Sequence, residues 1–167
     1  MIRTYSRYLI RKEEVGMVCL QKTICSMFCK ERCYYLWGSN EIDWVENGAI
    51  NNAGGIITMW RRSSFNMTSY VNGKSYSVVE GVWKVGAGVQ ITIVNVYNFG
   101  LLKERNEVWD EISELRKIQQ NRMCCVVEDF NSIRRKEERK SVVSVSDYSR
   151  KTRGLMVSSK MPSCWIL

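Results

Sequence analysis

The stretch MCCVVEDFNS, residues 123–132, decides the fold of this chain. Its first five residues are apolar and predict a buried β-strand, and a polar group follows directly. Because successive side chains of an extended chain point to opposite faces, Asp129 and Asn131 share one face and Phe130 turns to the other. A carboxylate and a carboxamide at the end of a strand can form half of a phosphate-handling site. Alternatively, Asp and Asn simply end the strand and open a turn, and this stretch alone leaves both interpretations open.

The sequence before this stretch predicts several strands and one long helix. Apolar residues recur at helical spacing from Leu101 to Gln119, and a strand is expected on each side, at 91–97 and 123–127. Further strands are expected at 15–21, 41–45, 56–60, 65–70 and 76–83. Asn72-Gly73 predicts a hairpin between the last two. The pattern therefore predicts a mixed α/β (α+β) fold with packed sheets rather than a purely parallel sheet.

A second helix is expected at residues 25–36, where three cysteines recur every fourth position. A zinc site needs a fourth ligand and usually a tighter spacing, so we interpret Cys25, Cys29 and Cys33 as small buried apolar groups. The glycine pair Gly54-Gly55 lacks the spacing of a nucleotide-binding loop. It is better explained by close approach of backbone segments.

The composition is that of a globular protein with an anionic partner. The 167 residues suit one domain, with 45% hydrophobic and 25% charged residues. The net charge of +8 favours binding to nucleic acid. The alternative explanation is that the excess of basic residues only aids solubility. Seven cysteines, an odd number without a leader segment, argue against a disulfide framework or a disulfide-linked partner. No apolar run reaches the roughly 18 residues of a membrane span. We therefore expect an intracellular protein of the nucleus or cytoplasm that is neither secreted nor membrane-bound.

Four stretches in this order resemble one family. They are MVCLQKT (17–23), NAGGIITMW (52–60), TIVNVY (92–97) and VEDFNS (127–132). Together they resemble the endonuclease/exonuclease/phosphatase superfamily, whose fold deoxyribonuclease I and apurinic endonucleases share. The amino-acid sequence between these stretches looks most like the endonuclease domain of plant LINE-type (non-LTR) retrotransposon polyproteins. The resemblance covers about residues 10–155 and implies a four-layer α/β sandwich, here a partial one, with the site at the top of its two sheets.

The resemblance implies a role for several residues. Asp129 would orient or activate water, Asn131 would hold a phosphate oxygen, and Tyr97 would help to stabilise the charged transition state. A hard Mg²⁺ ion held by carboxylates would supply the remaining charge, and DNA would be the substrate. Arg134 and Arg135, in a run of mixed charge, are candidates for contacts with nucleic-acid phosphates, although such runs are commonly solvated surface.

The departures from the family pattern bear on activity. The metal-binding glutamate of the family is Lys22 here, and an ammonium group repels a cation. The family has a glycine before this aspartate (Asp129 here), whereas this chain has Glu128. Its carboxylate could crowd or rescue the site. The terminal Ser-Asp-His of the family is missing, and the chain has no histidine at all. A general base or charge stabiliser is thereby lost.

Residues 141–167 show no convincing periodicity. Permissible codons for residues 155–167, read one frame over, can encode a segment that resembles the next helix of the family. We therefore expect residues 1–167 to form a single incomplete domain whose last segment follows a frameshift near residue 154. The expected function is that of a degenerate Mg²⁺-dependent DNA endonuclease, weakly active or inactive. The alternatives are a non-catalytic nucleic-acid-binding remnant, a phosphomonoesterase, or a chain that does not fold stably.

Overall fold

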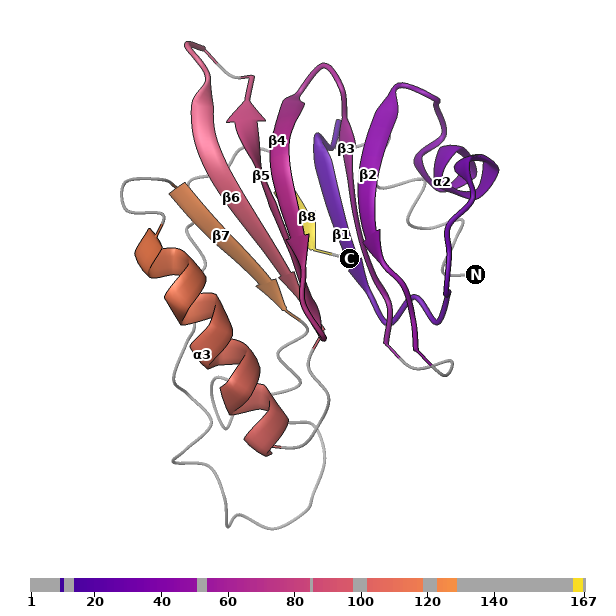
Figure 1. Cartoon of the computed structure of the whole chain (residues 1–167). Coiled ribbons are helices and arrows are strands. Elements are labelled where there is room, and N and C mark those ends of the chain that lie inside the picture. The colour runs from indigo at the N-terminus through magenta and orange to yellow at the C-terminus, as the bar shows by residue number, and fades with distance from the viewer. Residues whose placement is uncertain are drawn as a thin grey trace, which may run out of the picture.

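The chain folds into two packed β-sheets with a helix outside each of them (Figure 1). The computed structural model describes residues 10, 14–50, 54–84, 86–97, 102–118, 123–128 and 164–166. The strands are β1 (Met17–Gln21), β2 (Ile42–Asn47), β3 (Ile56–Arg61), β4 (Phe65–Asn72), β5 (Tyr76–Trp83), β6 (Val89–Val96), β7 (Met123–Glu128) and β8 (Cys164–Ile166). The helices are α2 (Lys30–Trp37) and α3 (Leu102–Ile118). The order of the first sheet is β2-β3-β1-β8, and that of the second sheet is β4-β5-β6-β7.

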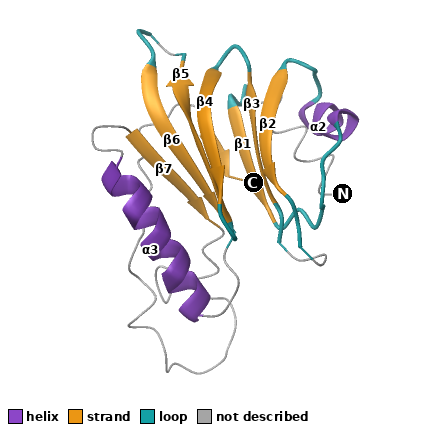
Figure 2. Cartoon of the chain, in the orientation of Figure 1, coloured by secondary structure: helices purple, strands orange, loops and turns teal. Residues whose placement is uncertain are grey.

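The layers run helix, sheet, sheet, helix (Figure 2). Helix α3 covers the outer face of the second sheet, where Val108 and Ile112 pack on Val94 and Val96. Helix α2 covers the outer face of the first sheet through Cys33 and Trp37. The predicted mixed α/β sandwich is thus confirmed. None of the helices in these ranges is long and apolar enough to cross a membrane.

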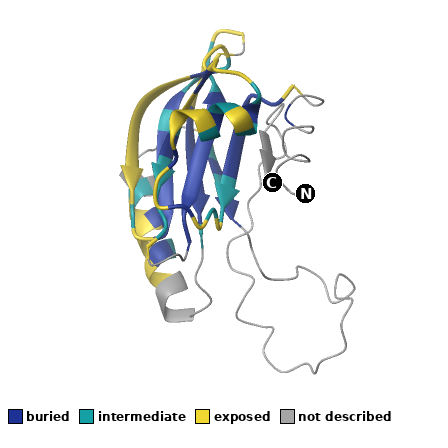
Figure 3. Ribbon diagram, turned by 90° about the vertical axis from the view of Figure 1, so that its right-hand side faces the viewer, coloured by how far each residue is buried: buried dark blue, intermediate teal, exposed yellow. Residues whose placement is uncertain are grey.

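The main core lies between the two sheets. Strand residues of both sheets alternate, so that every second side chain points inward, and the central strands are coloured as buried in Figure 3. The inward set consists of Met17, Cys19, Val45, Trp60, Phe65, Val79, Trp83, Ile91, Ile93, Cys125 and Val127. This core fixes the distance between the sheets, and therefore between any residues that the two sheets contribute to one site.

The second sheet contains the predicted strand–helix–strand unit. Strand β7 pairs parallel to β6, from Ile91 beside Met123 to Val96 beside Glu128, and α3 makes the connection. Because the strands are parallel, both end at the same edge, which is the lower one in Figure 1. Strand β1 of the first sheet also ends there. We call this edge, at which β1, β6 and β7 end, the site edge.

Two local expectations differ from the structure. Helix α2 begins at Lys30 rather than at residue 25, because Cys29 has extended backbone angles (φ −77°, ψ 157°) and forms the N-cap. Cys25 and Cys33 are buried as expected, whereas Cys29 is exposed. The tail has no strand pattern of its own, yet residues Cys164–Ile166 pair parallel with β1 as β8. The free edge of β1 supplies the hydrogen-bonding partner that the tail sequence does not reveal.

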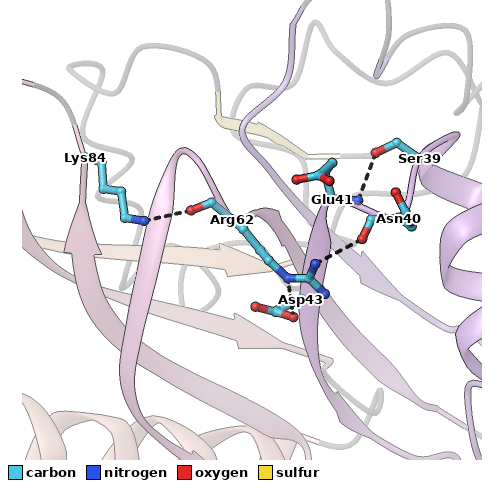
Figure 4. Close-up of polar contacts among 6 residues, drawn as sticks. All are labelled: Ser39, Asn40, Glu41, Asp43, Arg62 and Lys84. Atoms are coloured by element: carbon cyan, nitrogen blue, oxygen red, sulfur yellow. Dashed lines mark hydrogen bonds and ion pairs between the residues drawn. The ribbon is translucent and has the colours of Figure 1, made fainter.

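The end of the sandwich opposite the site edge is closed by a polar cluster on the surface (Figure 4). Arg62, in the β3–β4 turn, forms an ion pair with Asp43 at 2.9 Å and donates a hydrogen bond to the carbonyl of Asn40 at 3.2 Å. Lys84 Nζ donates to the carbonyl oxygen of Arg62 at 2.8 Å. The ion pair is about half exposed, so its contribution to stability is small.

Candidate functional site

The structure describes two of the residues that the sequence predicted for the site. Tyr97 directly follows β6, and Lys22 directly follows β1, so both lie at the site edge. Asp129, Asn131, Arg134 and Arg135 fall outside the described residues, and their roles stay predictions.

Lys22 and Tyr97 come from different sheets and meet across the site edge. The ammonium nitrogen of Lys22 lies over the ring of Tyr97, at 6.0 Å from its centroid. This is the outer limit for an attraction between a cation and an aromatic face. Lys22 is exposed and Tyr97 is half-buried, so the pair is accessible from solvent. The fold therefore brings a cation beside a phenol at the junction of the two sheets.

The backbone around Lys22 is held in an unusual conformation. Lys22 has φ 54° and Ile24 has φ 51°, in the left-handed region that a β-branched residue rarely adopts. The N–H groups of Thr23 and Ile24 donate to the carbonyls of Gly55 (3.2 Å) and Gly54 (3.0 Å). Gly54 and Gly55 also have positive φ values, of 76° and 85° respectively, a conformation that costs glycine little. These paired turns fix the point from which the Lys22 side chain extends.

A buried polar bridge lies directly beneath this pair. The amide of Asn95 on β6 accepts a hydrogen bond from Gln21 Nε2 at 2.6 Å. It donates to the carbonyl of Ile57 at 3.2 Å and to Thr58 Oγ1 at 3.1 Å. Asn95 is fully buried, while Gln21, Ile57 and Thr58 all belong to the first sheet. The bridge therefore ties the strand before Tyr97 to the strand before Lys22.

Sequence patterns alone did not predict this bridge. The signal was present, because Asn95 interrupts the apolar run of residues 91–97. A polar group inside a buried strand is almost always hydrogen-bonded, so it indicates a partner. What the sequence lacks is the identity of that partner, since Gln21 and Thr58 belong to other strands.

A second set of contacts holds the β4–β5 hairpin at the same edge. Asn47 Nδ2, at the end of β2, donates to the carbonyls of Gly73 (2.7 Å) and Tyr76 (3.0 Å). The N–H of Tyr97 donates to the carbonyl of Ser75 at 2.8 Å. Tyr97 is thereby anchored to the hairpin, and the hairpin to the first sheet. The predicted hairpin around Asn72-Gly73 thus also supports the site.

Two carboxylates of the described residues, Glu46 and Glu128, lie in strands that end at the site edge. Glu128 is buried and lies beside Val96 in the sheet. Alternation along β7 puts Glu128 with Cys124 and Val126 on the face that α3 covers, whereas Tyr97 shares the inner face with Asn95. Glu46 accepts the backbone N–H of Phe28 at 2.6 Å. Glu128 thus starts on the face of the sheet opposite to that of Tyr97, and its role at the site stays a prediction.

The described residues at the site edge do not form a site for a divalent cation. A hard cation such as Mg²⁺ is bound by carboxylate, carbonyl and water oxygens. Within the described ranges, no three acidic, cysteine or histidine residues are grouped so as to hold a metal ion. The ammonium of Lys22 adds a positive charge where a metal-binding carboxylate is expected from the sequence resemblance. The donor set at the Lys22–Tyr97 pair is suited to an anion instead.

Comparison with known proteins identifies the fold. The crystal structure of the AP endonuclease LMAP from Leishmania major matches with a TM-score of 0.55 and 15% sequence identity. The match covers 84% of this chain but only 53% of that one, so this chain spans about half the length of the matched protein. No protein-family model and no curated protein matches. The chain therefore shares an endonuclease/exonuclease/phosphatase-type fold, and the low identity carries the comparison no further than the fold.

Proposed function

We propose that this chain is a degenerate fragment of a Mg²⁺-dependent DNA endonuclease of retrotransposon origin, with weak or absent activity. The observation that carries the proposal is the meeting of Lys22 and Tyr97 at the site edge of a nuclease-like fold. The site edge retains Tyr97, whose hydroxyl is suited to a phosphate. It carries a cation where the related enzymes have their metal-binding carboxylate.

The remaining residues account for part of the chemistry of phosphodiester hydrolysis. Such a reaction needs an activated water and donors aimed at the developing negative charge. By resemblance Asp129 serves the water, while Asn131 and Tyr97 serve the phosphate. The metal-binding carboxylate is replaced by Lys22, and the chain has no histidine to act as a base or charge stabiliser. Two contributions to catalysis are thus missing, and we expect activity to be correspondingly low.

A nicking assay on supercoiled plasmid DNA with Mg²⁺ tests this proposal. The expected result is little or no conversion to the open circular form. Robust cleavage that Asp129→Ala abolishes would overturn the proposed loss of activity. It would at the same time identify Asp129 as a catalytic residue.

A second candidate function is that of a nucleic-acid-binding remnant without catalysis. The net charge of +8 and the exposed Lys22 favour it, and Arg134 and Arg135 are further candidates for phosphate contacts. It predicts salt-sensitive DNA binding without cleavage. The matching compartments are the nucleus and the cytoplasm, where fluorescence microscopy of a tagged chain can locate it.

The retrotransposon origin has a test of its own. Translation of the flanking genomic DNA in all frames should reveal a reverse-transcriptase reading frame downstream. It should also show a family-like helix in the alternate frame from about residue 154. Flanking DNA that contains neither would overturn the origin, without bearing on the nuclease-like fold.

A further inference from the structure

Strand β4 is the most exposed of the outer strands that the structure describes. The outer strands are β2 and β8 in the first sheet and β4 and β7 in the second. All residues of β4 except Phe65 are exposed, whereas β2 and β7 each have a single exposed residue and β8 has only three residues. Figure 3 shows β4 coloured as exposed over nearly its whole length. Because an outer strand pairs with its own sheet on one side only, β4 presents a row of backbone N–H and C=O groups to solvent.

The sequence of β4 is suited to pairing with another strand. Met67, Tyr70 and Val71 are large apolar residues, and their side chains are 37%, 54% and 50% exposed. The strand FNMTSYVN contains no charged residue and no proline, which are the residues that commonly keep the outer strands of natural sheets from pairing with other chains. The outer strand β2, by contrast, carries Asp43 and Glu46. Strand β4 therefore lacks the protection that β2 has.

An irregularity in β4 locates the part of the strand that can pair. The register with β5 shifts at a β-bulge between Met67 and Ser69, and a bulge disturbs pairing at the edge of a sheet. Residues 69–72 follow the bulge in unbroken register with β5. This regular segment contains Tyr70 and Val71, which are more exposed than Met67. The second half of β4 is therefore the part that is both regular and apolar.

The charge of the chain indicates which partner fits this segment. The net charge is +8, so two copies of the chain repel each other over much of their surface. An approach through the uncharged β4 brings no like charges of the strand itself together. A charged peptide finds no opposite charge on β4 to select it, whereas a second copy presents the same uncharged apolar strand. A patch that is complementary to itself is what a two-fold symmetric dimer requires.

We propose that the chain forms a two-fold symmetric dimer in which residues 69–72 of β4 pair antiparallel with the same residues of a second copy. The two-fold axis reverses the direction of the strand, so the two four-stranded sheets join into one continuous sheet. Tyr70 and Val71 of both copies come together near the axis, where their apolar surface is removed from water. Each copy uses its single β4, so the assembly is complete at the dimer. A contact made mainly by one strand is small, and the dimer therefore dissociates on dilution.

Sedimentation velocity of the full chain, freed of nucleic acid, tests the proposal over a range of protein concentrations. The expected result is a reversible shift from monomer to dimer, without larger species. Raising KCl from about 0.05 to about 0.3 M should strengthen the dimer, because salt screens the repulsion between two basic copies. Weakening by salt would indicate a complex bridged by residual nucleic acid and would overturn the proposal. A monomer at every concentration, or growth beyond the dimer, would overturn it as well.

Tyr70→Lys and Tyr35→Lys form a matched pair of variants. Both replace an exposed tyrosine by lysine and reach the same net charge, but Tyr35 lies on α2, outside the first sheet. Tyr70→Lys should raise the Kd of the dimer at least about tenfold, because it places like charges close together across the axis. Tyr35→Lys should change it by less than about twofold. Equal weakening in the two variants would show that only total charge matters and would overturn the proposal.

A second variant covers the case in which Tyr70→Lys does not fold. Val71→Lys changes a neighbouring residue that is half exposed, and it should weaken the dimer to a similar degree. Thermal melting of each variant shows whether it is folded before its association is measured. A folded Val71→Lys protein that dimerises as strongly as the wild type would contradict the assigned contact.

Hydrogen exchange locates the contact in the wild-type protein. At concentrations above the Kd of the dimer, the backbone amides of residues 69–72 should exchange more slowly than at concentrations below it. The amides of β2 should exchange equally in both conditions. Slower exchange on another surface, with β4 unchanged, would show that the dimer forms elsewhere and would overturn the proposal.

Discussion

The buried amide of Asn95 joins the two sheets, so its removal should lower the free energy of unfolding by a measurable amount. Asn95→Ala eliminates the hydrogen bonds to Gln21, Ile57 and Thr58 together. A buried hydrogen bond contributes about 1 kcal/mol net, so three of them give about 3 kcal/mol. The partner groups of Ile57 and Thr58 are fully buried and are left without this amide. We therefore expect the free energy of unfolding to fall by at least about 3 kcal/mol.

Urea denaturation followed by tryptophan fluorescence measures this loss. With an m value of about 2 kcal/mol/M, the unfolding midpoint should fall by about 1.5 M at unchanged m. Asn66→Ala is the control, because Asn66 is exposed on β4 and its replacement should stay within about 0.5 kcal/mol. A loss below about 1 kcal/mol for Asn95→Ala would refute the reasoning. So would an Asn95→Leu variant as stable as the wild type, since it would show that packing alone holds the sheets at this point.

Three further predictions concern packing, alkaline pH and metal binding. Gly81→Val should destabilise the second sheet by several kcal/mol in urea titrations, because any β-carbon at position 81 collides with the ring of Phe65 and a backbone carbonyl. Burial raises the pKa of the Cys19 thiol from 9.0 to about 12, and burial likewise raises that of Cys33 to about 12. Because the folded-state pKa lies above the unfolded one, the unfolding free energy is unaffected by Cys19 below pH 9.0 and falls by about 1.4 kcal/mol per pH unit as the pH rises from there toward about 12. Cys19→Ala should flatten this slope in pH-dependent unfolding, and an unchanged slope would contradict it. Lys22→Glu should strengthen Mg²⁺ binding in calorimetric titrations, and an unchanged titration would count against the placement of the metal site.

Local sequence patterns predicted the elements well where one face of an element is buried. The alternation and length of the apolar runs located β3, β5, β6 and β7 within about two residues, and the helical stripe located α3. The start of α2 was wrong by five residues, because cysteines at 25, 29 and 33 imitate a helical period. Cys25 is buried from an irregular segment that precedes the helix. Periodicity alone does not distinguish these two ways of burying a side chain.

The partners of an element are harder to predict than the element itself. Strand β8 forms where three tail residues meet the free edge of β1, and nothing in their own sequence reports that edge. The same holds for Asn47, whose side chain caps the β4–β5 turn from the other sheet. Both contacts depend on how the sheets stack. They are set by the tertiary structure and leave no short-range pattern in the sequence.

The same difference between an element and its partners applies to the candidate site. The sequence predicted its two described members separately, Tyr97 at a strand end and Lys22 as the substitute for a carboxylate. Only the fold shows that they meet and that Asn95 holds their strands together. This meeting changes what the substitution means. Lys22 stands where the resembled family has its metal-binding glutamate, and the fold places its ammonium group over the ring of Tyr97.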